Sequence, residues 1–277
     1  MTALAPHVNS PKDFSARADH RLRVTQLRVL RSEWTKFRSL RSTAWTMLMA
    51  VTFMIGLGAL FSATTANSAT GLDPGSTASS VSLTGTFFAQ LAIGVLGALM
   101  ITGEYGTGMI RASLTVVPKR LPMLWAKLTV LAAAVFSTML IASLTAFLLG
   151  QALLSGKHLN VALSNPTALR SVLGAALYLT VAAMIGLALG ALLRNTAAAI
   201  TTFVAVFFVI PTIASLLPAT WTSHFVQYLP SNAGTGLIDG TYGLANPLAP
   251  WTGFAVMCAF LAALIGLAAL RLQRTDA

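Results

Sequence analysis

Six apolar runs of about 20 residues, separated by short polar segments, dominate the pattern of this chain. They cover residues 44–63, 81–102, 128–150, 171–193, 196–217 and 251–270. Each run is long enough for an α-helix to cross the hydrocarbon core of a bilayer. Strand-like alternation of apolar and polar residues is absent from the runs, which argues against an outer-membrane barrel. The pattern predicts an all-α polytopic membrane protein, with six transmembrane helices in a domain that covers residues 44–272.

The residues before the first run divide into two parts. Residues 1–20 contain few large apolar side chains and predict a disordered tail. In residues 21–43 apolar side chains recur every three or four positions, and basic residues occupy much of the remaining surface. This pattern predicts an amphipathic helix that lies in the membrane interface. A solvated arm beside the membrane is the alternative. The candidate interface residues are Glu33, Trp34, Lys36, Phe37, Arg38 and Arg41.

The distribution of charge indicates the topology. The 277 residues are 56% hydrophobic and only 9% charged, whereas a soluble domain has about 25% charged residues. All but two of the 18 basic residues lie in segments that six crossings place on one side, the exceptions being Lys157 and Arg170. Basic segments stay in the cytoplasm, so both termini are expected there. The net charge of +11 then reflects topology and contact with anionic membrane lipids, and nucleic acid is not an expected partner.

A compact polar segment separates the second and third runs. It reads Gly103-Glu104-Tyr105-Gly106-Thr107-Gly108-Met109-Ile110-Arg111 and closes with Pro118-Lys119-Arg120. Gly103 and Gly108 have the spacing of a phosphate-binding loop, but Met109-Ile110 follow where Lys-Ser/Thr would hold phosphate and magnesium. The segment therefore does not predict a nucleotide site. Its position predicts a docking surface on the cytoplasmic side.

Catalytic and metal-binding patterns are missing from the sequence. The four histidines are scattered, and neither HExxH nor CxxC occurs, so we expect no catalytic site, metal or cofactor in this chain. The six runs hold essentially no charged residue, whereas ion- or proton-coupled transporters place such residues inside their spans. Active transport would then need a partner that supplies the energy. An uncharged pathway would suit an apolar or amphipathic cargo.

Three further features predict local structure. Residues 218–250 contain no Lys or Arg and one acid, Asp239, so this connection is a candidate to dip back into the membrane. Gly186 and Gly190 form a GxxxG motif, which predicts close helix packing, with a role in dimerisation as the alternative. Pro211 predicts a kink in the fifth span, because proline lacks an N–H and clashes with the preceding turn.

These motifs, in this order, resemble those of type-two ABC transporter permeases, the membrane subunits of ABC exporters. The resemblance rests on the polar segment 103–120 with Lys127 after it, on residues 32–43, which are similar to actinobacterial members, and on residues 229–233. It extends over about residues 22–272. One departure is Gly106, where the family pattern has a larger polar or basic residue; this would loosen the contact with the ATPase.

The resemblance implies a transport subunit of a bacterial cell membrane, with two kinds of protein partner. One is a separate ABC ATP-binding subunit, coupled through the 103–127 loop and the N-terminal helix; the other is a second permease copy, identical or not. The implied ATPase contacts are Glu104, Tyr105, Thr107, Arg111, Pro118, Lys119 and Arg120, and the implied outer gate is Pro230, Ser231 and Asn232. For Glu104 the alternative is a helix-end carboxylate paired with an arginine for stability alone. For the chain, the alternative is a membrane immunity or sensor protein of the same fold that does not transport.

Overall fold

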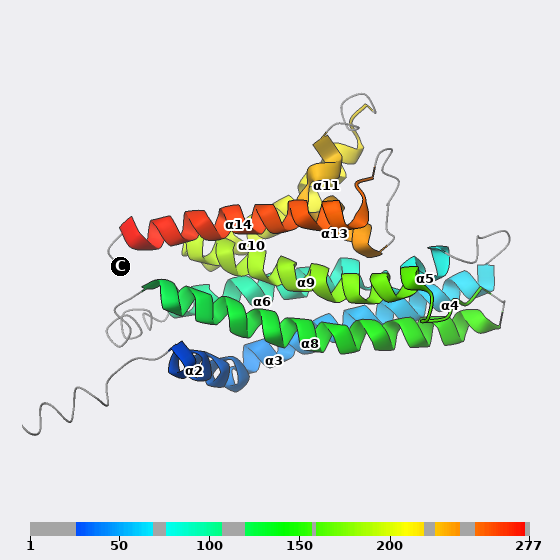
Figure 1. Ribbon diagram of the computed structural model, residues 1–277, viewed down its shortest axis with the longest axis horizontal. Coiled ribbons are helices and arrows are strands. Elements are labelled where there is room, and N and C mark those ends of the chain that lie inside the picture. The colour runs from blue at the N-terminus through cyan, green and yellow to red at the C-terminus, as the bar shows by residue number, and fades with distance from the viewer. Residues whose placement is uncertain are drawn as a thin grey trace, which may run out of the picture.

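The computed structural model describes residues 26–68, 76–106, 120–156, 159–218, 225–238 and 247–274. Within these ranges the chain is helical, with short connections and no strand. Six helical segments are long and apolar enough to cross a membrane: Arg41–Asn67, Thr86–Gly106, Leu121–Ser155, Pro166–Leu193, Thr196–Ser215 and Pro250–Leu272. The predicted all-α fold with six membrane-spanning helices is thus confirmed. Figure 1 shows the long helices lying side by side along one axis.

The central helix is α9 (Pro166–Leu193), most of whose side chains are buried. It begins at Asn165, whose side chain accepts a hydrogen bond from the backbone N–H of Thr167. Its small residues pack against α6 (Thr86–Gly106) inside the chain. A Cβ added to Gly186 would lie 2.2 Å from the carbonyl oxygen of Gly94, so only glycine allows this approach. The GxxxG motif therefore serves packing within the subunit.

The first span is built from α3 (Arg41–Thr52), the π-helix η1 (Phe53–Leu57) and α4 (Gly58–Ser68). The turn that connects α5 (Ser76–Ser82) to α6 packs against η1. A Cβ on Gly85 in this turn would lie 2.3 Å from the carbonyl oxygen of Met54. The apolar run 81–102 is thus interrupted by a turn at residues 83–85. Hydropathy did not predict this turn, because it depends on contact with a neighbouring helix.

Helix α8 (Arg120–Ser155) carries large apolar side chains that the rest of the chain does not cover. Ile141 and Leu148 on this helix are exposed, as expected for side chains that meet lipid. Exposed tryptophans lie near the ends of three spans, Trp45 in α3, Trp125 in α8 and Trp251 in α14 (Pro250–Arg274). Tryptophan is enriched at both membrane–water interfaces, so these positions agree with spans that end at the two edges of a bilayer.

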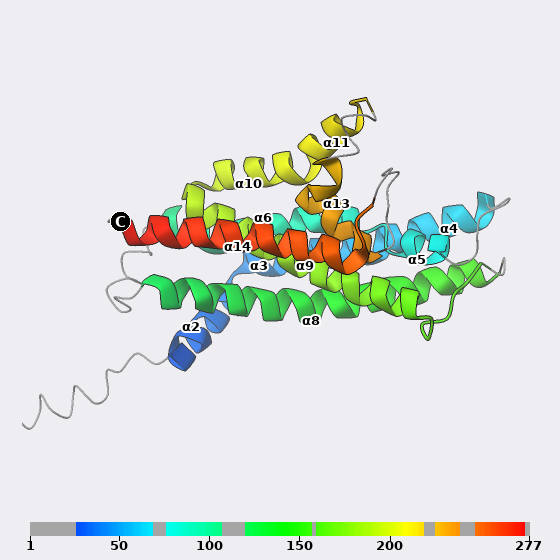
Figure 2. The ribbon, with the colours of Figure 1, turned by 45° about the horizontal axis from the view of Figure 1, so that its top comes forward.

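The fifth span bends as Pro211 predicts. A tight turn at Arg194, which has a positive φ of 57°, leads to α10 (Thr196–Val204), and the Asn195 side chain caps this helix at Ala198 N–H. The π-helix η2 (Ala205–Val209) follows and ends directly before α11 (Ile210–Ser215), which contains Pro211. Figures 1 and 2 show α11 turning away from the direction of α10. The missing N–H and the ring of Pro211 give the physical reason.

After the fifth span, a short irregular segment packs inside the bundle. It consists of η3 (Val226–Tyr228), α13 (Pro230–Thr235) and η4 (Gly236–Ile238). A Cβ on Gly234 would lie 2.5 Å from both the Met257 sulfur and the Tyr178 ring, and one on Gly253 would lie 2.3 Å from the Ala233 carbonyl oxygen. The segment is therefore held closely against α9 and α14. This burial in protein is the condition under which irregular backbone is tolerated at membrane depth.

Candidate functional site

Four charged side chains from three helices meet in one buried group, which we call the four-charge cluster: Glu33, Lys36, Glu104 and Lys127. Glu33 and Lys36 lie on α2 (Gln26–Ser39), Glu104 lies in the last turn of α6, and Lys127 lies near the start of α8. The Lys127 Nζ lies 2.6 Å from Glu33 Oε2 and 2.8 Å from Glu104 Oε1. The Lys36 Nζ lies 3.1 Å from Glu33 Oε1 and 3.1 Å from Glu104 Oε1. Two acids and two lysines thus neutralise one another.

Burial divides the two lysines into an inner and an outer member of the cluster. The Lys127 side chain is 2% exposed and that of Glu33 is 3% exposed, whereas the Lys36 side chain is 35% exposed. Burial alone would lower the pKa of Lys36, but the charges of Glu33 and Glu104, and hydrogen bonds to both, raise it overall. Lys36 therefore stays charged at neutral pH. The second oxygen of Glu104, Oε2, is buried and has no hydrogen-bond partner in the described part of the chain.

The position of the cluster connects it to the polar segment. Helix α6 ends at Gly106 and α8 begins at Arg120, and residues 107–119 between them lie outside the described ranges. Glu104 stands just before this connection and Lys127 soon after it, so their ion pair holds its two ends together. Both residues also pair with α2, and Figure 1 shows α2 and the start of α8 at the same end of the bundle as the C-terminus. The cluster thus links α2 to the helices on both sides of the connection, α6 and α8.

The sequence-predicted ATPase contacts are only partly within the described ranges. Glu104 is buried in the cluster, and its partners are lysines, not an arginine. Tyr105, next to Glu104, is half-buried, and the Arg194 guanidinium carbon lies over its ring, 5.6 Å from the ring centroid. This contact connects α6 to the turn between α9 and α10. Thr107, Arg111, Pro118 and Lys119, and the side chain of Arg120, lie outside what the structure describes.

On α2 the predicted interface residues do not share one face. Glu33 points into the protein, beside the buried Val29, and Lys36 follows it into the cluster. Trp34 is exposed and stacks on Phe37, with 6.2 Å between the ring centroids. Arg38 on α2 is exposed, and so is Arg41, which begins α3. The exposed surface of α2 is therefore basic and carries one tryptophan, while Glu33 is buried and paired with Lys127.

Sequence reasoning missed Lys127 as the partner of Glu33 and Glu104. It treated the spans as essentially uncharged, but α8 begins at Arg120 and α6 continues to Gly106, so both Lys127 and Glu104 belong to helices able to cross a membrane. The sequence did contain a clue to this pairing: Lys127 stands directly before a long apolar run, and Glu33 is the one acid on an otherwise basic helix.

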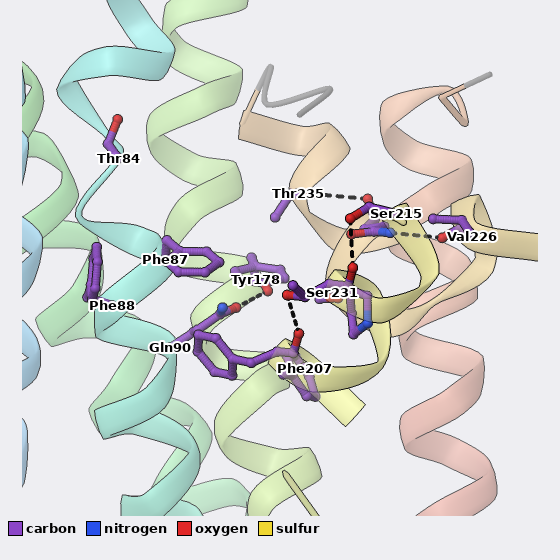
Figure 3. A pocket seen from close by; sticks show the side chains of 14 residues that line it. Thr84, Phe87, Phe88, Gln90, Tyr178, Phe207, Ser215, Val226, Ser231 and Thr235 are labelled. Atoms are coloured by element: carbon purple, nitrogen blue, oxygen red, sulfur yellow. Dashed lines mark hydrogen bonds between the residues drawn. The ribbon is translucent and has the colours of Figure 1, made fainter. Parts of the chain in front are cut away.

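A second candidate site lies between α6, α9, the η2–α11 part of the fifth span, and α13, and we call it the aromatic pocket (Figure 3). Its volume is about 470 Å³. Phe87, Phe88, Phe207 and Phe208 line one part of it, and hydroxyl and amide side chains line another. At its inner wall the Tyr178 hydroxyl donates a hydrogen bond to Gln90 Oε1. No acidic or basic side chain is among the described residues that line it.

The predicted gate residues lie beside this pocket. Ser231 and Asn232 line it, and Pro230 begins α13 as a buried residue. Asn232 Nδ2 donates a hydrogen bond to the carbonyl oxygen of Val226, 3.0 Å away, which fixes the turn between η3 and α13. The three residues thus form a folded unit at the pocket wall. Among the residues described, no group of three or more His, Cys, Asp or Glu side chains is placed to hold a metal ion.

A comparison with models of protein families shows the family of this chain. A family model described as "ABC-2 family transporter protein" matches residues 29–222, which include the whole four-charge cluster and most of the pocket wall. The chain belongs to this family and is a multi-pass transmembrane permease of ABC transporters. Membership implies association with an ATP-binding subunit and a transport role without enzyme activity in this chain. A search of curated proteins found no match.

Proposed function

We propose that this chain is the permease subunit of an ATP-driven exporter, and that a separate ATP-binding subunit drives it through residues 103–127 and α2. The family match supports the pairing with an ATPase. The four-charge cluster carries the specific proposal, because it joins the three elements on which a cytoplasmic partner would act. Ion pairs on both sides of the docking segment would allow force to pass from that segment into α2, α6 and α8.

The proposed coupling passes through the cluster in two steps. First, closure of the ATP-binding subunits displaces the 107–119 connection. Lys127 is bonded to Glu33 and Glu104, so α2, α6 and α8 then move together and do not slide past one another. Second, α6 carries the displacement along its close contact with α9 to the aromatic pocket, whose wall it forms with the fifth span. In this mechanism Glu104 orients the docking segment; it need not itself touch the ATPase.

The proposed orientation puts the cluster and both termini in the cytoplasm. Exposed basic side chains, such as Arg31 and Arg38 on α2 and Arg41 at the start of α3, would then face anionic headgroups of the inner leaflet. Trp34 would insert between these lipids. A second permease copy completes the proposed transporter, with an apolar or amphipathic cargo passing between inner and outer openings. Pro230, Ser231 and Asn232 would act at the outer gate.

Co-purification with the ATP-binding subunit tests this function directly. The two chains, expressed together with a tag on the ATPase only, should elute as one complex whose ATP hydrolysis is faster than that of the ATPase alone. Glu104→Ala should still insert into the membrane, but it should abolish that stimulation, because the docking segment loses its anchor. The matched control is Gln151→Ala, which removes a buried polar side chain far from the cluster. Wild-type stimulation by Glu104→Ala would contradict the coupling role.

A further inference from the structure

The aromatic pocket contains a buried hydroxyl group that has no partner among the described residues. Ser231 is 5% exposed and lines the pocket, yet its Oγ has no hydrogen-bond partner among the described residues. Buried polar groups are nearly always hydrogen-bonded, and leaving one unpaired is unfavourable. Figure 3 shows Ser231 and the Gln90–Tyr178 pair on the same cavity. An unpaired hydroxyl on a residue that lines a cavity is a place where a ligand can make the missing bond.

The rest of the pocket restricts the chemistry of such a ligand. Phenylalanine rings form one wall, with Phe87 and Phe208 in edge-to-face contact at 5.1 Å between centroids. Such a wall offers apolar ring surface against which an apolar part of a ligand can pack. No described lining residue is charged, so an ionised ligand would lose its hydration without gaining a counter-charge. A wholly apolar ligand would fill the space but leave Ser231 unpaired.

We propose that the aromatic pocket binds an uncharged amphipathic molecule, with its aromatic or alicyclic part against the phenylalanines and a hydrogen-bond acceptor on the Ser231 hydroxyl. The volume of about 470 Å³ is within the range of pockets that hold small molecules. This inference deepens the proposed export function, and it rests on that function where it assigns the ligand as cargo. Binding itself needs only the permease.

Photolabelling of the purified full chain in phosphatidylcholine nanodiscs, without any ATPase, tests the binding. The probes are benzophenone, which is uncharged with one carbonyl acceptor, its carboxylate 4-benzoylbenzoate, and the cation (4-benzoylbenzyl)trimethylammonium. Benzophenone should label peptides from the start of α6, from α11 and from α13 in a saturable manner. The two charged probes should label these peptides at least about tenfold less at equal concentration. Equal labelling by a charged probe, or labelling that never saturates and follows lipid exposure alone, would overturn the proposal.

The Ser231→Ala variant tests the hydrogen bond. Loss of one such bond should raise the half-saturation concentration of benzophenone by about two- to tenfold. Because no described protein group loses a partner, folding should be unaffected. The matched control is Ser79→Ala, which also removes a buried, unpaired hydroxyl but does not line this pocket. An unchanged half-saturation in Ser231→Ala would contradict the assigned bond.

A second variant tests the location by filling the pocket and leaving Ser231 in place. Thr212 is an exposed residue of α11 at the pocket wall, and Thr212→Phe places a bulky side chain there. Saturable labelling should fall at least about tenfold; if it persists, the probe binds elsewhere. Should labelling behave as proposed while the ATPase fails to co-purify, the exporter proposal fails and the ligand site stands. If the ATPase co-purifies but labelling does not behave as proposed, the exporter proposal stands and the ligand site fails.

Discussion

Replacement of each cluster lysine by methionine should have very different effects on stability, although both lysines contact the same two acids. Lys127 is 2% exposed, and Lys127→Met leaves two carboxylates facing a single, outer lysine. Removing one partner of a buried ion pair costs about 3–5 kcal/mol. Lys36 is 35% exposed, and pairs open to solvent contribute about 0.2–1 kcal/mol. The expected destabilisation by Lys127→Met is therefore several times that by Lys36→Met.

The comparison needs an equilibrium measurement in a membrane-like solvent. Titration of the purified chain with SDS in mixed micelles, followed by circular dichroism, gives the free energy of unfolding of each variant. Both variants remove one positive charge and keep an unbranched side chain, so each serves as the control for the other. Equal losses, within about 0.5 kcal/mol, would refute the assignment of Lys127 as the inner member of the cluster.

A double variant tests whether charge balance is the cause. Adding Glu33→Gln to Lys127→Met restores neutrality, since Glu104 and Lys36 remain as one pair. The double variant should then be more stable than Lys127→Met alone, with a coupling energy within about 0.5–3 kcal/mol. If Glu33→Gln lowers stability further in this background, packing and not charge explains the effect of Lys127.

Three further predictions address other parts of the molecule. Gly186→Ala should destabilise the chain by about 1–3 kcal/mol or more in the same SDS titration, since its Cβ would meet the Gly94 carbonyl. The control Gly266→Ala, with no neighbour within 4 Å, should be neutral or slightly stabilising. Equal effects would contradict the packing of α6 on α9. A peptide of residues 26–41 should bind vesicles that contain anionic lipid, and replacing Trp34 and Phe37 by Asp should release it; unchanged binding in a sedimentation assay would remove the interfacial role of these rings. Because the pKa of Lys36 lies above its ordinary 10.5, its ion-pair contribution is fully present below that pH and disappears only as the pH rises through the higher value. The stability difference between wild type and Lys36→Met should thus stay constant from about pH 6 to 9 and shrink above about pH 10.5; a difference that already changes near neutral pH would contradict this.

The spans and local helix features were readable from the sequence because they depend on near neighbours in the chain. Length and hydropathy predict six crossings, Pro211 predicts the distortion that η2 and α11 contain, and glycines at i and i+4 predict the tight face of α9. Each of these follows from the chemistry of a residue and those within a few turns of it.

The cluster and the pocket depend on residues that are distant in the sequence. Glu33 and Lys127 are 94 positions apart, and no local pattern indicates that α2 lies against the start of α8. An amphipathic pattern predicts which face is apolar, but it does not show that the acid on that helix is buried. The turn at Gly85 was missed for the same reason, since it is explained by the carbonyl of Met54 on another helix.

Spin-label distance measurements on the complex with its ATP-binding subunit test the central claim, that the four-charge cluster transmits ATP-driven movement to the outer half of the permease. The lone cysteine, Cys258, is first replaced by serine, and labels are placed on exposed Leu153 of α8 and Leu216 after α11. Labelled chain is mixed with excess unlabelled chain so that distances within one subunit dominate.

The predicted result is a shift of this distance in the wild-type complex when ATP binds to a non-hydrolysing ATPase. The Glu104→Gln/Lys127→Met double variant keeps the cluster neutral, so it should still fold and bind the ATPase, but its distance should not shift. An ATP-dependent shift as large as that of the wild type, measured in the double variant with the ATPase bound, would contradict the account.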